Sequence, residues 1–465
     1  MTKKIISLLL AIVMILCTGV SAFAYADFEV DDNDHYSIHF NSDGKFRILH
    51  LSDIQDDYPL TPASKQFINE ILAEYQPDLV VLGGDNTVAS KEDKEAAIEE
   101  LCNIFIDNDT LFTIVFGNHD DEQGYTREEL WEMYEEYSYG YFVGFDATAA
   151  DGSDLTGVGN HYIPLLSSDG DEIIYNLYML DSNSYVKLND GNTVYDCVHE
   201  DQIKWYKGVR EALKAETGDY VPSMVFQHII CQEALDELYY SSNVSFASVN
   251  EHLGMDVDGK NYSFLPKYYK IQEGFLDEFT CCGYYNYGEA DAMLEEGDVK
   301  AIFSGHDHVN DFTITLTSKE KNDDGEYNTL NLVNTAGETF HSYSKIYSRG
   351  ARLIELDENN IDTYTTKRIT VAETVLKEGS LISECEGGMS KSQAKLALVL
   401  RSVKETFNDI LTLISQFMAT FDIRPLVKDG SELVSKGYNS FKSDSAEMAT
   451  NAGKLISSFF SSLLG

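Results

Sequence analysis

Five short apolar runs in this sequence each end in an aspartate, an asparagine or a histidine. Segments of helical periodicity separate several of the runs, as in a chain that alternates strands with helices. The carboxyl ends of strands in an open α/β sheet meet at one edge, so side chains that follow the strands gather in one crevice. The sequence therefore predicts an α/β domain with a polar site at that edge. The runs span residues 46–51, 79–82, 112–116, 224–227 and 299–303.

The segments between the first runs contain recognisable helix start signals. A proline in the first turn costs no hydrogen bond, and a Ser or Thr three residues before an acidic residue has the spacing of a capping box. These signals predict helices that reach residues 75 and 106, and a third helix after residue 126. The signals are Thr61 with Pro62, Ser90 with Asp93, and Thr126 with Glu129. By contrast, the acidic, glycine-bearing stretch 146–171 is predicted to be a solvated loop.

The polar residues that follow the runs are of metal-ligand type. Each of them alone also suits a turn or a helix cap, so the indication comes from their convergence. Carboxylate, amide and imidazole groups bind divalent cations, and seven such groups are enough for two ions. Gly305 lets the backbone come close to whatever the last two histidines hold. The seven candidates are Asp53, Gln55, Asp85, Asn118, His228, His306 and His308.

These motifs resemble the five motifs of the calcineurin-like metallophosphoesterases, in order and at similar spacing. The resemblance covers residues 44–370. It points to the branch related to purple acid phosphatases, because residues 297–312 are similar to a long signature of that branch. The matching segments are Asp53-Ile-Gln55, Gly84-Asp85-Asn86, Gly117-Asn118-His119-Asp120, His228 and Gly305-His306-Asp307-His308.

The resemblance implies a fold, a site and a reaction. The fold is a four-layered α/β sandwich of two β-sheets flanked by helices. The reaction is hydrolysis of phosphate monoesters or diesters by a metal-bound hydroxide, with His119 protonating the departing alcohol and Asp120 or another carboxylate orienting it. Asp85 bridges two divalent ions, with Asp53, Gln55 and His308 on one ion and Asn118, His228 and His306 on the other.

Two positions depart from the family pattern. Gln55 stands where the family has histidine, and its neutral amide oxygen is a weaker ligand than imidazole for zinc or iron. The first ion is therefore expected either to bind more loosely or to be a harder cation such as manganese. The choice among manganese, zinc and iron stays open. Val88 stands where purple acid phosphatases have tyrosine, so a coloured iron(III) tyrosinate centre is not expected.

Charge and the N-terminal segment bear on location and partners. The net charge is -44, which repels polyanions and argues against nucleic-acid binding. Residues 1–26 have the pattern of a secretory signal peptide, and their apolar run falls short of the roughly 20 residues that a membrane anchor, the alternative, requires. We therefore expect a secreted or extracytoplasmic protein. Six further cysteines permit disulfides, but no pairing follows from their spacing.

The insert between His228 and His306 is rich in tyrosine. These rings either form a rim that stacks on a sugar or base beside the phosphate, or pack within the insert, and we favour packing. Among the histidines outside the motifs, His341 is expected nearest the site because it follows a late strand at residues 330–333. The tyrosines are Tyr239, Tyr240, Tyr262, Tyr268, Tyr269, Tyr284, Tyr285 and Tyr287.

Residues 389–465 differ in composition from the rest and carry no resemblance to the family. An a/d stripe predicts one long helix, interrupted at Pro425 and Gly430, and a weaker apolar face follows between residues 441 and 459. We expect a C-terminal α-helical hairpin that docks on the catalytic domain, associates with a second copy or touches an envelope or membrane surface. The stripe consists of Leu396, Leu400, Val403, Phe407, Ile410, Ile414, Phe417 and Phe421.

Two functions are compatible with the sequence. The first is an exported metal-dependent phosphoesterase that acts on a small phosphorylated substrate. The second is a cell-surface binding module that keeps the fold but has little activity, which Gln55 and the helical tail suggest. His119 and the other ligand-type residues are all present, which favours the enzyme.

Overall fold

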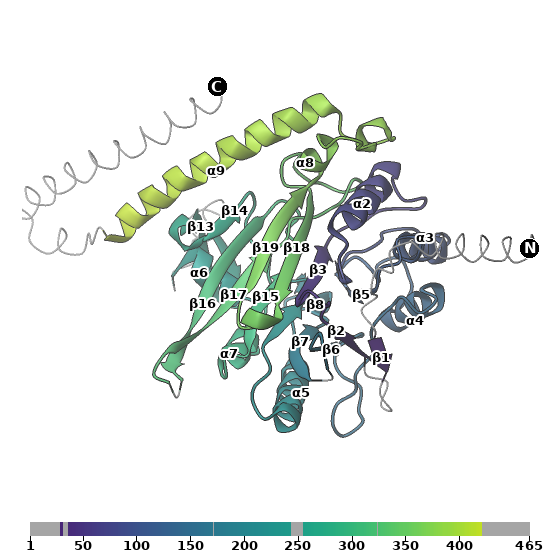
Figure 1. The fold of residues 1–465 in the computed structure, drawn as a ribbon. Helices are drawn as coiled ribbons and strands as arrows, with labels where there is room; N and C mark the ends of the chain where they lie inside the picture. The colour runs from purple at the N-terminus through teal and green to yellow at the C-terminus, as the bar shows by residue number, and fades with distance from the viewer. Residues whose placement is uncertain (1–27, 31–35, 171, 243–253, 323, 421–465) are drawn as a thin grey trace, which may run out of the picture.

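The computed structural model describes residues 28–30, 36–170, 172–242, 254–322 and 324–420 (Figure 1). The predicted signal peptide, residues 1–26, lies outside these ranges. So does the second helix of the predicted C-terminal hairpin. Within the described ranges, no helix is both long enough and apolar enough to cross a membrane.

Two large β-sheets form the centre of the molecule (Figure 1). The nine-stranded sheet is mixed and runs in the order β1 (Phe28–Val30), β2 (Tyr36–His39), β6 (His161–Leu166), β7 (Ile173–Met179), β10 (Ser223–Phe226), β15 (Val299–Ser304), β17 (Tyr327–Asn334), β16 (Asp311–Lys321) and β14 (Glu273–Phe275). The five-stranded sheet runs in the order β19 (Tyr364–Thr370), β18 (Gly350–Asp357), β3 (Lys45–Leu51), β4 (Leu79–Gly83) and β5 (Phe112–Val115). The strands β3, β4 and β5 are parallel, as are β7, β10, β15 and β17.

Helices cover the outer face of each sheet. The remaining strands form two small sheets, β11 (Tyr239–Ser242) with β13 (Lys260–Pro266) and β12 (Gly254–Val257), and the hairpin β8 (Tyr185–Lys187) with β9 (Thr193–Tyr195). The helices are α2 (Pro62–Tyr75), α3 (Lys94–Asp107), α4 (Arg127–Tyr137), α5 (Glu200–Thr217), α6 (Glu233–Leu238), α7 (Glu289–Leu294), α8 (Val371–Val375) and α9 (Lys391–Thr420). Three short 3-10 helices complete the described elements: η1 (Tyr268–Lys270), η2 (Glu358–Asn360) and η3 (Ile382–Glu384).

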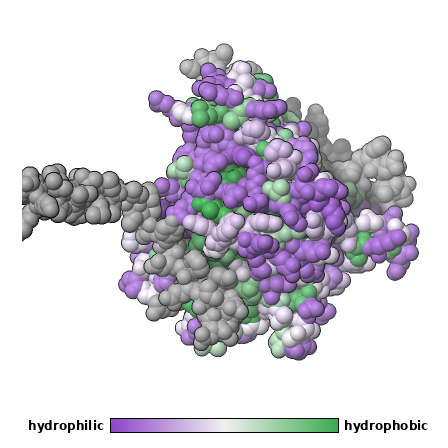
Figure 2. All heavy atoms as spheres, turned by 90° about the vertical axis from the view of Figure 1, so that its right-hand side faces the viewer, coloured by the Kyte–Doolittle hydropathy of each residue, from purple (hydrophilic) through white to green (hydrophobic). Residues whose placement is uncertain are grey.

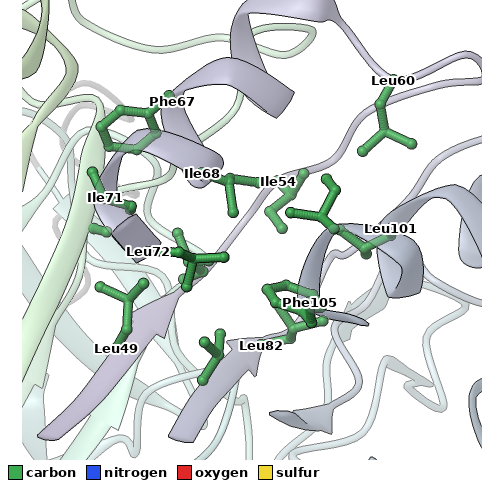
Figure 3. Close-up of a cluster of buried hydrophobic side chains, with 14 of the residues drawn as sticks. Leu49, Ile54, Leu60, Phe67, Ile68, Ile71, Leu72, Leu82, Leu101 and Phe105 are labelled. Carbon is green, nitrogen blue, oxygen red and sulfur yellow. The ribbon is translucent and has the colours of Figure 1, made fainter. Parts of the chain in front are cut away.

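The apolar runs are buried on both faces because each sheet lies between two layers. In β4, Val80 and Leu82 pack against the helices α2 and α3, whereas Val81 packs between the two sheets against residues such as Phe226. Figure 3 shows the helical side of this core, where Leu49 and Leu82 on the strands meet side chains of both helices. A third cluster fills the space between the nine-stranded sheet and helices α5, α6 and α7. The four-layered α/β sandwich is confirmed.

Most of the predicted elements are present, and three local details are wrong. The capping box at Thr126 and Glu129 forms, but Thr61 makes no side-chain cap and Ser90 bonds instead to the carboxylate of Asp93. The stretch 146–171 is not one solvated loop, because it contains the largely buried strand β6 of the nine-stranded sheet. The acidity of the stretch obscured that strand.

The face in Figure 2 and the state of the cysteines can be compared with the composition of the chain. Figure 2 shows that the face on the side of α3 and α4 is covered mostly by hydrophilic residues, in keeping with the strong negative charge. All six cysteines after the N-terminal segment lie in the described part of the chain, and all are free thiols there.

Candidate dinuclear metal centre

The candidate ligands converge at the carboxyl ends of the central strands. Asp53 follows β3, Asp85 follows β4, Asn118 follows β5, His228 follows β10, and the two late histidines follow β15. The backbone is left-handed at four of these sites, with φ of 52° at Asp53, 45° at Gln55, 51° at Asp85 and 69° at His306. Non-glycine residues rarely adopt this conformation, and its cost is tolerated where it places a functional side chain.

Glycines make the convergence sterically possible. A Cβ at Gly117 would lie 2.2 Å from Oδ1 of Asp85, and a Cβ at Gly305 would lie 1.7 Å from Oγ of Ser52. Both distances are far below van der Waals contact, so the backbone of each motif approaches its neighbour as only glycine allows. Gly305 therefore brings its backbone close to Ser52 in the motif after β3, whereas the sequence predicted a close approach to the group that the late histidines hold.

Asp85 is shared by two groups of ligand-type atoms. One group combines Asp85 with His228 and His306, and the other combines it with Asp53 and His308; within each group one atom per residue lies within 4.8 Å of the others. Gln55 lies beside them, and its Nε2 donates to Oδ2 of Asp85 at 3.5 Å. The two groups divide Asp53 and His308 from His228 and His306, as the family resemblance implied, but they assign neither Gln55 nor Asn118.

Hydrogen bonds orient two of the imidazoles toward this cluster. Nδ1 of His228 lies 2.8 Å from the carbonyl oxygen of Gly83, and Nδ1 of His308 lies 2.9 Å from that of Tyr343. A protonated Nδ1 that donates to a carbonyl leaves Nε2 with a free lone pair, as metal-binding histidines require. The freed Nε2 atoms lie 3.2 Å from Oδ2 of Asp85 in His228 and 3.4 Å from Oδ1 of Asp53 in His308.

Three buried ligand atoms in the centre have no hydrogen-bond partner in the described structure. Such atoms normally cost ~1–3 kcal/mol each, so a cluster of them calls for a binding partner. All three carry lone pairs and therefore fit divalent cations. The three atoms are Oε1 of Gln55, Oδ1 of Asn118 and Nε2 of His306.

The electrostatics of the centre also favour a cation. Burial opposes a charged imidazole at His228, but the carboxylates of Asp85 and Asp53 raise the pKa of His228 to about 10. Burial acts to raise the pKa of Asp85, yet the interaction with His228 lowers it below its usual range. Two fully buried carboxylates thus need positive charge beside them, which a metal ion supplies more strongly than a proton.

His119 lies at the rim of the centre and is held by a carboxylate. Its Nδ1 is 2.6 Å from Oε2 of Glu122, and the backbone N–H of His119 donates to Oδ1 of Asp85 at 2.7 Å. Although burial acts to lower it, Asp85 and Glu122 raise the pKa of His119. The other oxygen of Glu122 accepts a hydrogen bond from Tyr185, whose hydroxyl in turn accepts one from Asn118.

Of the two alternatives that the sequence left open, Asp120 or another carboxylate beside His119, the structure shows the second, because Glu122 rather than Asp120 contacts the ring. The Asp120 carboxylate accepts main-chain N–H bonds from Gly117 and Asp85 through Oδ2, and from Asn86 through Oδ1, at 2.8 to 3.0 Å. It therefore ties the loop after β5 to the loop after β4. Asp120 thus holds the backbone of Asp85 and of Gly117, which precedes Asn118, and not the His119 ring.

A cavity of about 470 Å³ opens onto the centre, within the range of small-molecule sites. Five candidate residues of the centre line it, together with five residues that the motifs do not include. All eight insert tyrosines lie in the described part of the chain, and none of them lines this cavity, in agreement with the preference for packing. The lining residues are Gln55, Asp85, Val88, His119, Tyr195, His306, His308, His341, Ser342 and Tyr343.

Four residues around the centre were not predicted from the sequence. Glu122 could have been found from the sequence, because it stands three residues after His119, a spacing that brings two side chains together within one helical turn. Tyr185 and Tyr195 come from the β8–β9 hairpin. The Tyr195 ring meets the His306 ring edge-on, with 4.4 Å between the ring centroids. Tyr343 stacks on His308 at 4.2 Å. No local pattern marks these tyrosines, since only the folded chain brings them to the metal ligands.

Comparison with known proteins agrees with this geometry. A family model described as calcineurin-like phosphoesterase matches residues 46–310, more than half of the chain. A protein of Arabidopsis thaliana named "Probable inactive purple acid phosphatase 14" is 27% identical over 386 residues, which cover 76% of this chain and 84% of the relative. "Phosphatase DCR2" of Saccharomyces cerevisiae is 27% identical over 349 residues, which cover 70% of this chain but only 54% of the yeast protein.

Several solved structures also match this chain. One of them is described as "GAP50 the anchor in the inner membrane complex of Plasmodium" and is 12% identical, with a TM-score of 0.36 over 70% of this chain and 84% of the other. The family assignment does not depend on this similarity. It follows from the family model, whose match begins at the first residues of β3 and ends just after the last two histidines. The chain belongs to the calcineurin-like phosphoesterase family.

Proposed function

We propose that this protein is an exported, metal-dependent phosphoesterase that hydrolyses phosphate monoesters or diesters at a dinuclear site. One observation carries the proposal: buried ligand atoms without partners surround a carboxylate shared by two groups. A protein that used the fold only as a binding surface would have no need to bury these groups, which reduce its stability. The family membership supports this class of reaction.

Asp85 would contribute to both of the ion sites, because it belongs to both groups of candidate ligands. Asp53, Gln55 and His308 would hold one ion, and Asn118, His228 and His306 would hold the other. Bound divalent cations polarise a phosphoryl group and lower the pKa of a coordinated water. Gln55 supplies an amide oxygen rather than an imidazole, so the first position suits a hard ion such as manganese better than zinc or iron.

His119 is placed to protonate the departing alcohol. It lies beside the centre without belonging to either ligand group, and it also lines the cavity. Glu122 holds Nδ1, so the opposite ring nitrogen is left to carry a proton toward the substrate. The carboxylate both fixes the ring plane and stabilises the charged imidazolium.

The alternative is a binding module with little or no activity on the same fold. Two observations favour it: the glutamine at position 55, and a relative whose printed name contains the word inactive. The same chain keeps His119 with a carboxylate at 2.6 Å, which a binding module does not require. We therefore place the enzyme first.

The test measures metal and turnover on the same samples. Purified protein is assayed for bound metal and for hydrolysis of 4-nitrophenyl phosphate and bis(4-nitrophenyl) phosphate, with Asp85→Asn and His119→Ala as the variants. His199→Ala is a matched control, because His199 also bonds a carboxylate at 2.9 Å but does not line the cavity. Bound metal, with turnover lost in Asp85→Asn, reduced in His119→Ala and kept in the control, supports the enzyme. Protein without metal, or activity indifferent to Asp85, supports the binding module.

Export is tested separately. The proposal requires cleavage within or just after residues 1–26. Expression of the full sequence followed by N-terminal sequencing of protein recovered outside the cytoplasm gives the site directly. Recovery of the intact N-terminus in the cytoplasmic fraction would contradict export and leave the proposed reaction untouched.

A further inference from the structure

The loop between β17 and β18 places two polar side chains in the cavity that belong to no motif. His341 and Ser342 lie near the middle of this loop, and both line the cavity together with the candidate metal ligands. His341 is exposed rather than packed in the core. The sequence indicated only that His341 would approach the site, and the proposed ligand set does not use it.

The loop is held rigidly against the metal centre. One face of Tyr343 stacks on the His308 ring with an interplanar angle of 5°, and its carbonyl oxygen lies 2.9 Å from Nδ1 of the same histidine. Three main-chain bonds join the preceding residues to the site motifs: Gly337 N–H to the carbonyl of His308 at 3.1 Å, Glu338 N–H to Ser52 at 2.9 Å, and Thr339 N–H to Asp53 at 3.0 Å.

Thr339 fixes the turn itself. Its hydroxyl oxygen accepts the backbone N–H of His341 at 3.1 Å and that of Ser342 at 2.8 Å. Both residues therefore start from a backbone that is tied on one side to Asp53 and on the other to His308. A loop built in this way presents its side chains at a set distance from the ions that those two residues would hold.

The chemistry of the cavity leaves a gap that these residues fill. A phosphoester is an anion, yet none of the described residues that line the cavity is a lysine or an arginine. Metal ions take some phosphoryl oxygens, and the others need hydrogen-bond donors. Two other donors are already engaged: His119 faces the leaving group in the proposed reaction, and the Tyr343 hydroxyl donates to Glu278 at 3.3 Å. His341 and Ser342 are the remaining donors from this loop.

We propose that His341, with Ser342 beside it, binds the phosphoryl oxygens of the substrate that the metal ions do not take. The inference rests on the proposed function, since it concerns the same cavity. It makes the loop between β17 and β18 a substrate-binding element of this chain. It also limits the substrate to a phosphoester whose phosphoryl group reaches both the metal centre and the loop within about 470 Å³.

The experiment titrates the metal-loaded full protein with inorganic phosphate by calorimetry and measures KM and kcat for 4-nitrophenyl phosphate. The variants are His341→Ala, His341→Gln and Ser342→Ala. Lys345→Ala is the matched control, because Lys345 is exposed in the same loop but does not line the cavity. Bound metal and the circular dichroism spectrum are recorded for each protein.

A lost hydrogen bond to a charged group weakens binding by roughly 10-fold or more. We expect His341→Ala to raise the phosphate Kd and the KM by at least that factor, with metal content unchanged. His341→Gln should retain part of the affinity through its amide N–H, Ser342→Ala should lose less than His341→Ala, and Lys345→Ala should match the wild type. Phosphate binding by His341→Ala within about 2-fold of the wild type would overturn the inference.

The design separates failure of the inference from failure of the proposed function. A wild type that binds metal and phosphate but hydrolyses no ester contradicts the proposed function, while the phosphate titration still decides the role of His341. A metal-loaded wild type that shows no phosphate binding overturns the inference. Loss of metal in His341→Ala would also overturn it, because His341 would then support the centre rather than the substrate.

Discussion

The metal centre and the helix α9 both reverse the usual distribution of polar and apolar residues. At the centre, Asp53, Asn118 and His228 are fully buried. On α9, Leu396 and Phe407 each expose 52% of their surface. The centre thus hides polar groups from water, and the helix shows apolar groups to it.

The inward face of α9 explains the difference. It is made of small and polar residues: Ala394 and Ala397 are buried, Lys404 pairs with Asp277, and Asn408 donates to the carbonyl of Gly274 at 3.3 Å. The part of the predicted stripe for which side chains are described therefore turns largely away from the catalytic domain, with Leu396, Leu400, Val403, Phe407 and Ile414 exposed; Phe421 lies outside the described residues. Both arrangements cost stability, because buried polar groups without partners and exposed apolar side chains are each unfavourable.

Asp85→Asn should have the largest effect, because it removes the charge that both ions share. Substitution of residues that merely support a ligand costs roughly 10–100-fold in metal affinity or activity, so a bridging ligand should cost more. We expect bound metal to fall below two ions per chain and kcat/KM to fall by more than about 100-fold. Metal analysis and steady-state kinetics measure both. Retention of two ions by Asp85→Asn would contradict the role of the Asp85 carboxylate as a ligand shared by both ions.

His119→Ala should lower kcat by about 100-fold or more for esters of alkyl alcohols, the usual contribution of a general acid. Metal content should stay at the wild-type level, because His119 belongs to neither ligand group. The loss should be smaller for 4-nitrophenyl esters, whose leaving group departs without a proton. An equal loss for alkyl and nitrophenyl esters would contradict the role as acid.

The strand ends could be predicted from the sequence because their signals are local. Each apolar run and the polar residues after it stand within a few positions, and the edge of a parallel sheet brings them together. The ligand types at Asp53, Asp85 and His228 were therefore available without the structure. The division into two groups around Asp85 came from the family resemblance.

The remaining parts depend on contacts between distant segments. Tyr343 stacks on a histidine 35 residues away, and the hydroxyl of Tyr185 bonds to Asn118, 67 residues away. No periodicity marks such pairs. The direction of the α9 stripe was also beyond the sequence, because an a/d pattern shows which residues share a face but not which way that face turns.

Glu122→Gln should have a smaller effect than loss of His119 itself, about 10-fold in kcat, the low end for residues that orient a catalytic group. Glu122 raises the pKa of His119, so its removal lowers that pKa. A general acid must be protonated, and the alkaline limb of the pH profile should therefore move to lower pH. Kinetics between pH 5 and pH 9 show the direction. A shift to higher pH would show that Glu122 acts on another group.

The smallest effect is expected on α9, where a matched pair of neighbours tests the reversed packing. Phe407→Lys places a charge at a position that is 52% exposed, so the free energy of unfolding should change by no more than about 0.5 kcal/mol. Asn408→Ala should cost about 1 kcal/mol, because Asn408 is 6% exposed and loses its bond to Gly274. Urea unfolding of both variants gives the two values.

This order, in which the asparagine matters more than the phenylalanine, is the opposite of what a helix packed through its apolar stripe would give. A large loss of stability in Phe407→Lys would show that residues 421–465 or a second copy already cover the stripe. Sedimentation velocity distinguishes these two cases by showing whether two copies associate. Only with a second copy would the loss of stability depend on protein concentration. An unchanged monomer with unchanged stability would leave the stripe free for a partner outside the chain.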